Sequence, residues 1–210
     1  MNKTLVRVCF LFFLHLSLAQ AQINTDSIAL STSSSEGRSR YKQLAEKLQQ
    51  SDSTLQRHDF LSLYYGSVQQ PAYNLDLIDS LEQRIKEQNL LQQFIVAYEL
   101  ADSLLAFHAV SITAYFEKSF SCYALKRTDE ESINKQKYRL FIKCVLSSGD
   151  GSLQTPFVVV SYNDAIEVIK YLQIKYKTIE EADNNLIVAV LNKKRQGSDK
   201  LYFRIPVPRP

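Results

Sequence analysis

The chain has 210 residues, of which 45% are hydrophobic and 22% charged, and its formal net charge is +3. This length and composition are typical of a globular protein with one domain, or with two small subdomains that share a core. The near-neutral charge argues against nucleic acid as a partner, because phosphate binding requires a surplus of clustered Lys and Arg.

Residues 1–21 have the three parts of a secretory signal peptide. Lys3 and Arg7 supply the positive start, Val8 to Leu18 the apolar run, and Ala19-Gln20-Ala21 a small-residue cleavage site. The apolar run is too short to span a bilayer, so we expect cleavage after Ala21, with an uncleaved membrane anchor as the alternative. Cleavage would lower the net charge from +3 to +1 by removing two cations. It would leave a periplasmic or secreted protein without a transmembrane segment.

Residues 22–37 contain the stretch Ser-Thr-Ser-Ser-Ser-Glu-Gly and no apolar periodicity. This composition predicts a flexible leader ahead of the folded part. Ser27 lies in this leader, between Asp26 and Ile28, and is a candidate for export-linked glycosylation because a flexible leader would be accessible.

Residues 38–148 predict a run of helices, because apolar residues recur there every three to four positions, starting with Tyr41, Leu44 and Leu48. Short polar joints between the segments predict antiparallel neighbours, hence an array of helical hairpins. The array is tetratricopeptide-like in architecture, although the Trp, Leu-Gly and Tyr spacing of that repeat family is absent. Gly66 is expected to end one helix in the left-handed conformation, although Ser67 to Gln70 could also continue the turn before Pro71.

Residues 149–210 predict a small mixed subdomain. Three short strands are expected at Phe157 to Val160, Leu186 to Leu191 and Leu201 to Val207, with one helix through Ala165 and Leu172. Three strands bury little surface alone, so this antiparallel sheet should dock on the helical array. The predicted fold class is therefore α+β.

Signal cleavage would leave two cysteines, Cys122 and Cys144. If they lie on consecutive antiparallel helices that turn near Thr128, they would be about 15 Å apart along the helices, which is too far for a disulfide. We expect two buried free thiols, with a disulfide as the alternative that export would permit.

One candidate binding site is a set of aromatic and amide residues near a predicted helix end, namely Tyr64, Tyr65, Gln69 and Tyr73. Tyrosine has an apolar ring and a polar tip, which suits a recognition groove and equally suits a packed joint between hairpins. The packed joint is the favoured interpretation.

The second candidate binding site is Gly149-Asp150-Gly151. Backbone N–H groups of such a loop can bind an anion, and Asp150 could contribute to a calcium site. A calcium loop normally carries several acidic residues at alternating positions, so a helix stop followed by a turn is the favoured interpretation.

Familiar catalytic and metal-binding signatures are missing from the sequence. His58 and His108 do not form a His-Glu-x-x-His pattern, and Cys-x-x-Cys, Gly-x-Ser-x-Gly and phosphate-loop motifs are absent. His58 and Asp59 are adjacent, and neighbours along a helix point apart, so we interpret them as a helix-start cap or a surface pair rather than a catalytic dyad. We therefore predict no catalytic residue, no metal site and no cofactor.

Four motifs in order resemble a domain-of-unknown-function family numbered 4919. They are Leu63-Tyr64-Tyr65-Gly66, Ser147-Ser148-Gly149-Asp150-Gly151, Thr155-Pro156-Phe157-Val158-Val159 and Leu201-Tyr202-Phe203-Arg204-Ile205. The resemblance covers about Tyr41 to Val207 and implies an exported protein of Gram-negative bacteria with no assigned activity. At the position of Arg204 that family more often carries an acidic or amide residue.

The expected function is a non-enzymatic binding or interaction module for a peptide, a protein or an envelope component, because stacked helical hairpins create extended grooves. The alternative is a hydrolase whose carboxylates or tyrosines converge only in the fold. Two buried carboxylates with perturbed pKa in a closed pocket would favour the hydrolase. A large exposed apolar patch would favour a structural partner in a larger assembly.

Overall fold

The computed structural model describes residues 23–182, 185–195 and 197–206. The predicted signal peptide and its cleavage site, like the final residues 207–210, lie outside this described part. No helix in the described ranges is long and apolar enough to cross a membrane.

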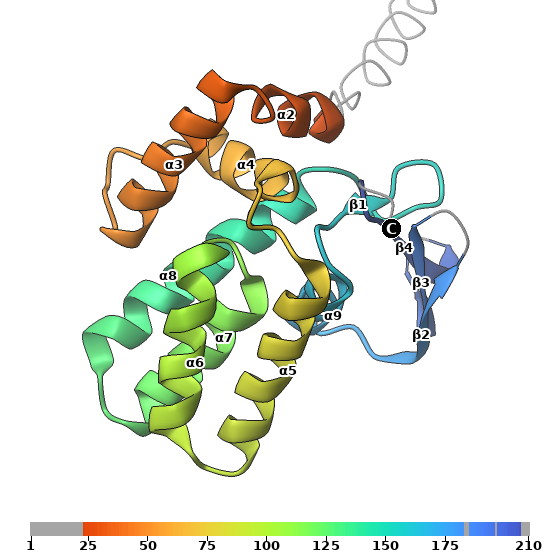
Figure 1. Ribbon diagram of the computed structural model, residues 1–210. Helices are drawn as coiled ribbons and strands as arrows, with labels where there is room; N and C mark the ends of the chain where they lie inside the picture. Colours follow the sequence, from red (N-terminus) through yellow and green to blue (C-terminus); the bar gives the residue numbers. More distant parts are fainter. Residues whose placement is uncertain (1–22, 183–184, 196, 207–210) are drawn as a thin grey trace, which may run out of the picture.

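The first two thirds of the described chain form paired helices, as predicted (Figure 1). These are α2 Thr25–Ser31, α3 Ser35–Gln49, α4 Arg57–Gly66, the 3-10 turn η1 Ser67–Gln69, α5 Leu75–Leu90, α6 Phe94–Phe107, α7 Ile112–Ala124 and α8 Thr128–Leu146. Asn74 and Ser111 cap α5 and α7 by accepting backbone N–H bonds from Leu77 and Ala114. Gly66 has φ −75°, so the predicted left-handed end is wrong. The alternative is confirmed, because Ser67–Gln69 continue the helix as the 3-10 turn η1.

The prediction of a flexible leader at residues 22–37 is wrong, because this stretch contains α2 and the start of α3. Thr25 and Ala29 are buried on α2, which packs against α4. The Thr32 hydroxyl donates to the Gly66 carbonyl oxygen at 3.3 Å, and Arg204 near the end of the chain pairs with Asp26. The buried face of α2 includes Thr25 and, directly after the helix, Thr32. Because threonine is not counted as apolar, a hydropathy pattern does not reveal this face.

Ser27 therefore lies on an exposed side of a short helix, and its backbone N–H bonds the Asn24 side chain. Its accessibility agrees with the glycosylation hypothesis, but the flexible context on which that hypothesis relied does not exist.

The sheet follows the helices and has the order β1-β4-β3-β2. Its strands are β1 Phe157–Val158, β2 Tyr176–Ala182, β3 Leu186–Arg195 and β4 Ser198–Arg204, and helix α9, Tyr162–Tyr171, follows β1. Ile187 and Ala189 of β3 and Phe203 of β4 are fully buried. Figure 1 shows the sheet beside the helices, with α9 between them.

The fold class α+β is confirmed, and the sheet differs from prediction in two respects. It has four strands rather than three, and it is mixed rather than antiparallel because β1 runs parallel to β4. β2 was missed because it is an edge strand exposed along nearly its whole length, so apolar and polar residues do not alternate in it.

The two cysteines are free and buried, as predicted. Cys122 lies near the end of α7 and Cys144 near the end of α8, on antiparallel neighbours. Burial raises the pKa of the Cys122 thiol to about 11 and that of Cys144 to about 12, so both thiols stay protonated.

Candidate binding surface

Tyr64 and Tyr65 lie where the helices meet the first strand, and both are fully buried. The Tyr64 hydroxyl donates to Asp164 Oδ2 at 2.6 Å and accepts the Val160 N–H at 3.3 Å. The Tyr65 hydroxyl donates to the carbonyl oxygens of Cys144 at 3.2 Å and Val158 at 3.3 Å. Burial raises the pKa of both phenols well above the ordinary value of tyrosine, so neither is an acid near neutral pH.

Tyr73 reaches the same segment from the other side of η1, and its hydroxyl donates to the Val160 carbonyl oxygen at 2.9 Å. Gln69 is half-buried within η1. Three of the four predicted binding residues thus meet on the stretch Val158–Val160. They form the packed joint between helices and sheet, and the buried rings of Tyr64 and Tyr65 line no open groove.

The loop at Gly149-Asp150-Gly151 closes on itself. The backbone N–H groups of Asp150 and Gly151 both donate to the Thr155 carbonyl oxygen at 3.0 Å. Asp150 Oδ1 accepts the Ser152 N–H and the Thr155 hydroxyl, which lower the pKa of this carboxyl. These two N–H groups already have acceptors, which favours the predicted helix stop and turn over an anion site.

Two acidic residues are buried between α5 and α9, and no sequence motif pointed to them. The Ser111 hydroxyl donates to Glu82 Oε1 at 2.6 Å, as Tyr64 does to Asp164. Glu82 Oε2, Asp164 Oδ1 and Glu167 Oε2 have no hydrogen-bond partner in the described part of the chain. Burial, followed by repulsion from neighbouring carboxylates, raises the pKa of Glu82 to about 8 and that of Asp164 to about 7.

These two carboxylates are about 1% exposed, so a substrate cannot reach them in this conformation. In the described residues no group of three His, Cys, Asp or Glu side chains could hold a metal ion. Asp59 caps α4 by accepting the Gln56 N–H at 2.9 Å, as predicted. His58 nonetheless turns back to within 3.2 Å of Asp59 Oδ1, so the expectation that these neighbours point apart is wrong.

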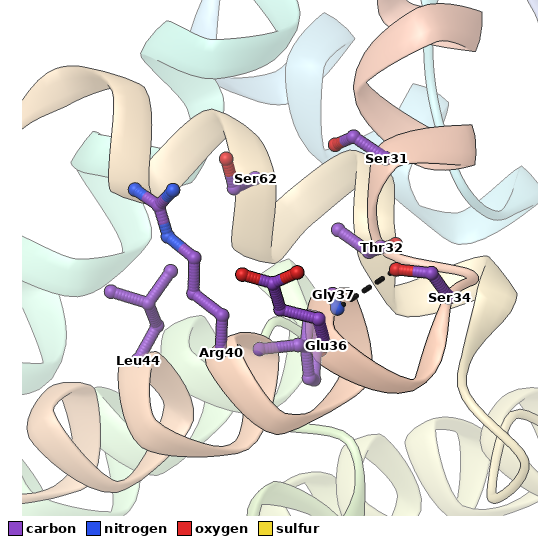
Figure 2. Close-up of a pocket in the computed structure, with 9 residues that line it drawn as sticks. Ser31, Thr32, Ser34, Glu36, Gly37, Arg40, Leu44 and Ser62 are labelled. Carbon is purple, nitrogen blue, oxygen red and sulfur yellow. Dashed lines mark hydrogen bonds between the residues drawn. The ribbon is translucent and has the colours of Figure 1, made fainter.

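A shallow cleft of about 230 Å³ opens between α2, α3 and α4 (Figure 2). Its lining residues are Ser31, Thr32, Ser34, Glu36, Gly37, Arg40, Tyr41, Leu44 and Ser62. The hydroxyls of Ser31 and Thr32 already donate to backbone carbonyls of α2. A cleft of this size is below the usual range of ligand pockets.

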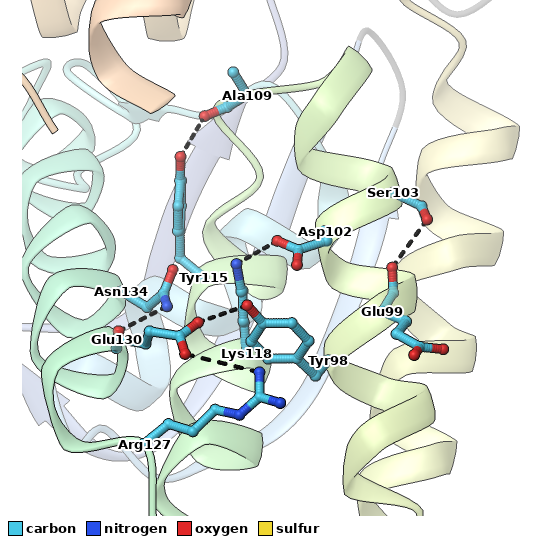
Figure 3. A network of polar contacts seen from close by, with 10 residues as sticks. All are labelled: Tyr98, Glu99, Asp102, Ser103, Ala109, Tyr115, Lys118, Arg127, Glu130 and Asn134. Carbon is cyan, nitrogen blue, oxygen red and sulfur yellow. Dashed lines mark hydrogen bonds and ion pairs between the residues drawn. The ribbon is translucent and has the colours of Figure 1, made fainter. Parts of the chain in front are cut away.

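A polar network joins α6, α7 and α8 (Figure 3). The Tyr98 hydroxyl donates to Glu130 Oε2 at 2.5 Å, and Lys118 forms an ion pair with Asp102. The Lys118 Nζ and Arg127 Cζ atoms lie 4.6 Å and 4.5 Å from the centre of the Tyr98 ring. The network therefore holds two cations on one aromatic ring.

The most distinctive surface feature is a set of exposed apolar residues, which we call the apolar strip. Its members come from the α5–α6 turn and from α7, α8 and α9, and they are Leu90, Leu91, Phe94, Phe116, Phe120, Tyr123, Tyr138 and Tyr171. Six of them are exposed, whereas Phe94 is half-buried and Tyr138 is buried. Leu90 is 82% exposed, Leu91 66% and Tyr123 66%, while Phe120 is 45% exposed.

Ring contacts link the aromatic members of the strip in two groups, and the second group is joined through the buried ring of Tyr138. The ring centres of Phe94 and Phe120 are 6.0 Å apart, those of Phe116 and Tyr138 are 5.4 Å apart, and those of Tyr138 and Tyr171 are 6.1 Å apart. Phe116 and Phe120 are four residues apart on α7, so they share one face of that helix. These residues are apolar in the sequence, but the sequence does not show which apolar residues are buried in the core and which are exposed.

Comparison with known proteins places these features in a family. A family model described as a domain of unknown function, DUF4919, matches residues 26–209, and so includes both α2 and the tyrosine joint. No curated protein and no solved structure matches the chain. Because the family match spans nearly the whole chain, the protein belongs to the DUF4919 family.

Proposed function

We propose that the protein is an exported, non-enzymatic interaction module that binds a partner protein of the cell envelope through the apolar strip. The observation that carries this proposal is the set of exposed apolar side chains of the strip, of which Leu90, Leu91, Phe120 and Tyr123 are each more than 40% exposed. Ring contacts tie the aromatic members to half-buried Phe94 and buried Tyr138. Contiguous exposed apolar surface is rare on monomeric proteins and marks interaction sites.

The strip has the composition of a binding surface. Aromatic side chains bury a large area for the loss of only two rotatable bonds each, which is why they dominate binding energy at interfaces. α7 presents Phe116 and Phe120 from a rigid base, because Tyr115 and Cys122, on another side of this helix, pack into the core. The strip is thus ordered before a partner arrives, and little entropy is lost on binding.

Charges at the edge of the strip indicate the chemistry of the partner. Exposed Lys126 lies three residues after Tyr123. The Lys170 Nζ lies 6.0 Å from the centre of the Phe116 ring and also pairs with Glu167 at 2.8 Å. A partner segment with an apolar face and acidic residues beside it would match both features. We therefore expect an amphipathic, acidic segment of another protein as the occupant.

The structure supports this function over the hydrolase alternative. The carboxylates with raised pKa, Glu82 and Asp164, do exist, but each is about 1% exposed and accepts a hydroxyl hydrogen bond. Neither lines the cleft between α2, α3 and α4. Catalytic groups must reach the substrate, and these two carboxylates are enclosed by packed helices.

The test is native mass spectrometry of the protein recovered from its envelope fraction. A chain mass of residues 22–210 is expected, with a protein partner retained. The variant Phe120→Ser with Tyr123→Ser should lose the partner, whereas the control Leu153→Ser, exposed in the loop before β1, should keep it. Retention of the same partner by the double variant would contradict the proposal, and a mass that includes residues 1–21 would contradict export.

A further inference from the structure

Four acidic residues are buried where α9 lies beside α5 and α7 (Figure 1). We call them the buried acidic cluster, and its members are Glu82 of α5, Glu117 of α7, and Asp164 and Glu167 of α9. None of them is more than 8% exposed. Carboxylates are almost never fully buried unless a cation pairs with them. Four of them on three helices therefore need a physical explanation, which the proposed function does not supply.

Hydrogen bonds of Asn163 fix the place of this cluster. The Asn163 side chain accepts a bond from Lys86 Nζ at 3.2 Å and donates one to Asp79 Oδ1 at 3.3 Å. Asp79, Glu82 and Lys86 are three and four residues apart, so they share one face of α5. Asn163 therefore spans the part of α5 that carries Glu82, and Asp164 is the next residue on α9. Both carboxyl groups thus belong to the same contact between α5 and α9.

The hydrogen-bond donors at the centre of the cluster are neutral. Ser111 donates to Glu82 and Tyr64 donates to Asp164, each through a hydroxyl at 2.6 Å. The other oxygens, Glu82 Oε2 and Asp164 Oδ1, are buried and have no hydrogen-bond partner within the described part of the chain. A buried carboxylate without a cation is strongly unfavourable, so such a group takes up a proton instead.

The lysines beside the cluster are held elsewhere. Lys170 Nζ pairs with Glu167 Oε1 at 2.8 Å, and Lys86 Nζ donates to the amide oxygen of Asn163. In the described residues neither ammonium group forms an ion pair with Glu82 or Asp164. The two central carboxyl groups are therefore stable in this packing only while they are protonated.

The surrounding charges agree with protonated carboxyls. Burial raises the pKa of Glu82 to about 8 and that of Asp164 to about 7, and repulsion from other acidic residues adds to this rise. Hydrogen bonds from the two hydroxyls and the charge of Lys86 act in the opposite sense. The titratable and charged groups around the pair are Tyr64, Asp79, Lys86, Glu117, Glu167 and Lys170.

We propose that the buried acidic cluster is a pH-sensitive switch, which holds α9 against α4 and α5 while Glu82 and Asp164 are protonated and releases α9 when both are ionised. The released form binds fewer protons, so its population rises with pH, by up to about tenfold per pH unit for each carboxyl. Tyr171 of the apolar strip lies on α9, so release would also remove one side of the strip. That consequence rests on the proposed function, whereas the release of α9 does not.

Hydrogen exchange of the purified protein tests the release without a partner. Protection factors, corrected for the intrinsic exchange rate at each pH, are compared for α9 and α8 at pH 6 and pH 8 in low concentrations of urea. Protection of α9 should be lower than that of α8 and should fall at least about tenfold between the two pH values. It should also depend less on urea, because a local opening exposes little surface.

Two results of this exchange experiment would overturn the proposal. Equal protection and equal urea dependence of α8 and α9 at both pH values would mean that α9 leaves only when the whole protein unfolds. Protection of α9 that does not change with pH would mean that the carboxyls do not control the opening.

Substitutions assign the effect to the cluster. Glu82→Gln combined with Asp164→Asn keeps the side-chain sizes and removes both ionisations, so α9 should be equally protected at pH 6 and pH 8. Glu87→Gln, exposed on the same helix α5, should keep the pH dependence of the wild type. A double variant that retains the wild-type dependence would contradict the proposal.

Infrared spectroscopy of the wild type does not depend on the folding of any variant. A carbonyl stretching band of protonated carboxyl groups should be present at pH 6 and lost by pH 9. Absence of that band at pH 6 would show that the cluster is ionised in the closed form, and the proposal would be wrong.

Discussion

The hydroxyl groups of Tyr64, Tyr65 and Tyr73 connect the helices to the segment around β1 and α9. Substitution by phenylalanine removes such a hydroxyl and keeps the aromatic ring. Tyr64→Phe takes away the donor to Asp164 Oδ2 and leaves a buried carboxyl oxygen without its partner. We expect a loss of about 1–3 kcal/mol in the free energy of unfolding, measured by urea denaturation. Tyr123→Phe removes an exposed hydroxyl and should change stability little. Equal effects of the two substitutions would contradict the structural role of the joint.

The loop that follows α8 depends on the absence of one side chain. A Cβ atom at Gly149 would lie 2.4 Å from the carbonyl oxygens of Thr155 and Pro156, which belong to rigid backbone. Gly149→Ala should therefore destabilise the fold by more than about 2 kcal/mol. At Gly197 a Cβ atom would meet nothing within 4 Å, so Gly197→Ala carries only the strain of φ +84° and should cost about 1 kcal/mol. Thermal unfolding of the two variants compares them directly, and a smaller loss for Gly149→Ala would refute the account.

At the scale of elements, buried Glu82 joins α5 to Ser111 at the start of α7, and buried Asp164 joins α9 to Tyr64 of α4. Both carboxyls have a folded-state pKa above the unfolded value, so the folded state binds more protons between about pH 4 and pH 8. This contribution to stability is fully present below the unfolded pKa and is lost as the pH rises through that window. The contribution of His108 to stability has the opposite pH dependence. Burial lowers its pKa to about 4, so this contribution is lost as the pH falls below about 6.5.

Glu82→Gln isolates this effect, because glutamine keeps an acceptor for Ser111 and cannot ionise. We expect the difference in stability between variant and wild type to shift in favour of the variant as the pH rises from 4 to 8. Urea denaturation at several pH values measures it, with exposed Glu87→Gln as the matched control. A difference that does not change with pH would show that Glu82 is not a buried, protonated group.

Several elements could be predicted from the sequence, and the exceptions have physical causes. α5, α6, α7 and α8 show the helical period because each packs one apolar face into a shared core. α2 was not predicted because polar residues occupy buried positions there, namely Thr25 on the helix and Thr32 directly after it. β2 was not predicted because it is exposed on both faces. The parallel pairing of β1 with β4 joins segments more than 40 residues apart, which local patterns cannot reveal.

The candidate sites were harder to predict than the elements. The tyrosines were identified by type, yet only the fold shows that Tyr64 and Tyr65 are buried. Glu82 and Asp164 come together from positions far apart in the chain and follow no motif. The apolar strip was hidden for a related reason, since Phe116 and Phe141 look alike in sequence, while Phe141 is fully buried and Phe116 is 38% exposed.

At the scale of the whole molecule, the joint should make the helices and the sheet unfold together. The buried thiols report this, because Cys144 lies at the joint and Cys122 lies near the far end of α7. Pulsed alkylation in increasing urea should modify both cysteines in one transition, which coincides with the loss of circular dichroism. Reaction of Cys144 at lower urea than Cys122 would mean that the joint opens separately.

The central claim is that the apolar strip binds a partner protein, and position-specific photo-crosslinking in cells tests it most directly. A photoreactive phenylalanine at Tyr123 or Leu90 should form a crosslinked product with one partner, and the product should disappear when Phe120→Ser is added. The same probe at Leu153, which is also exposed but lies off the strip, should not form it. The same product from all three positions, or none from Tyr123 and Leu90, would contradict the account.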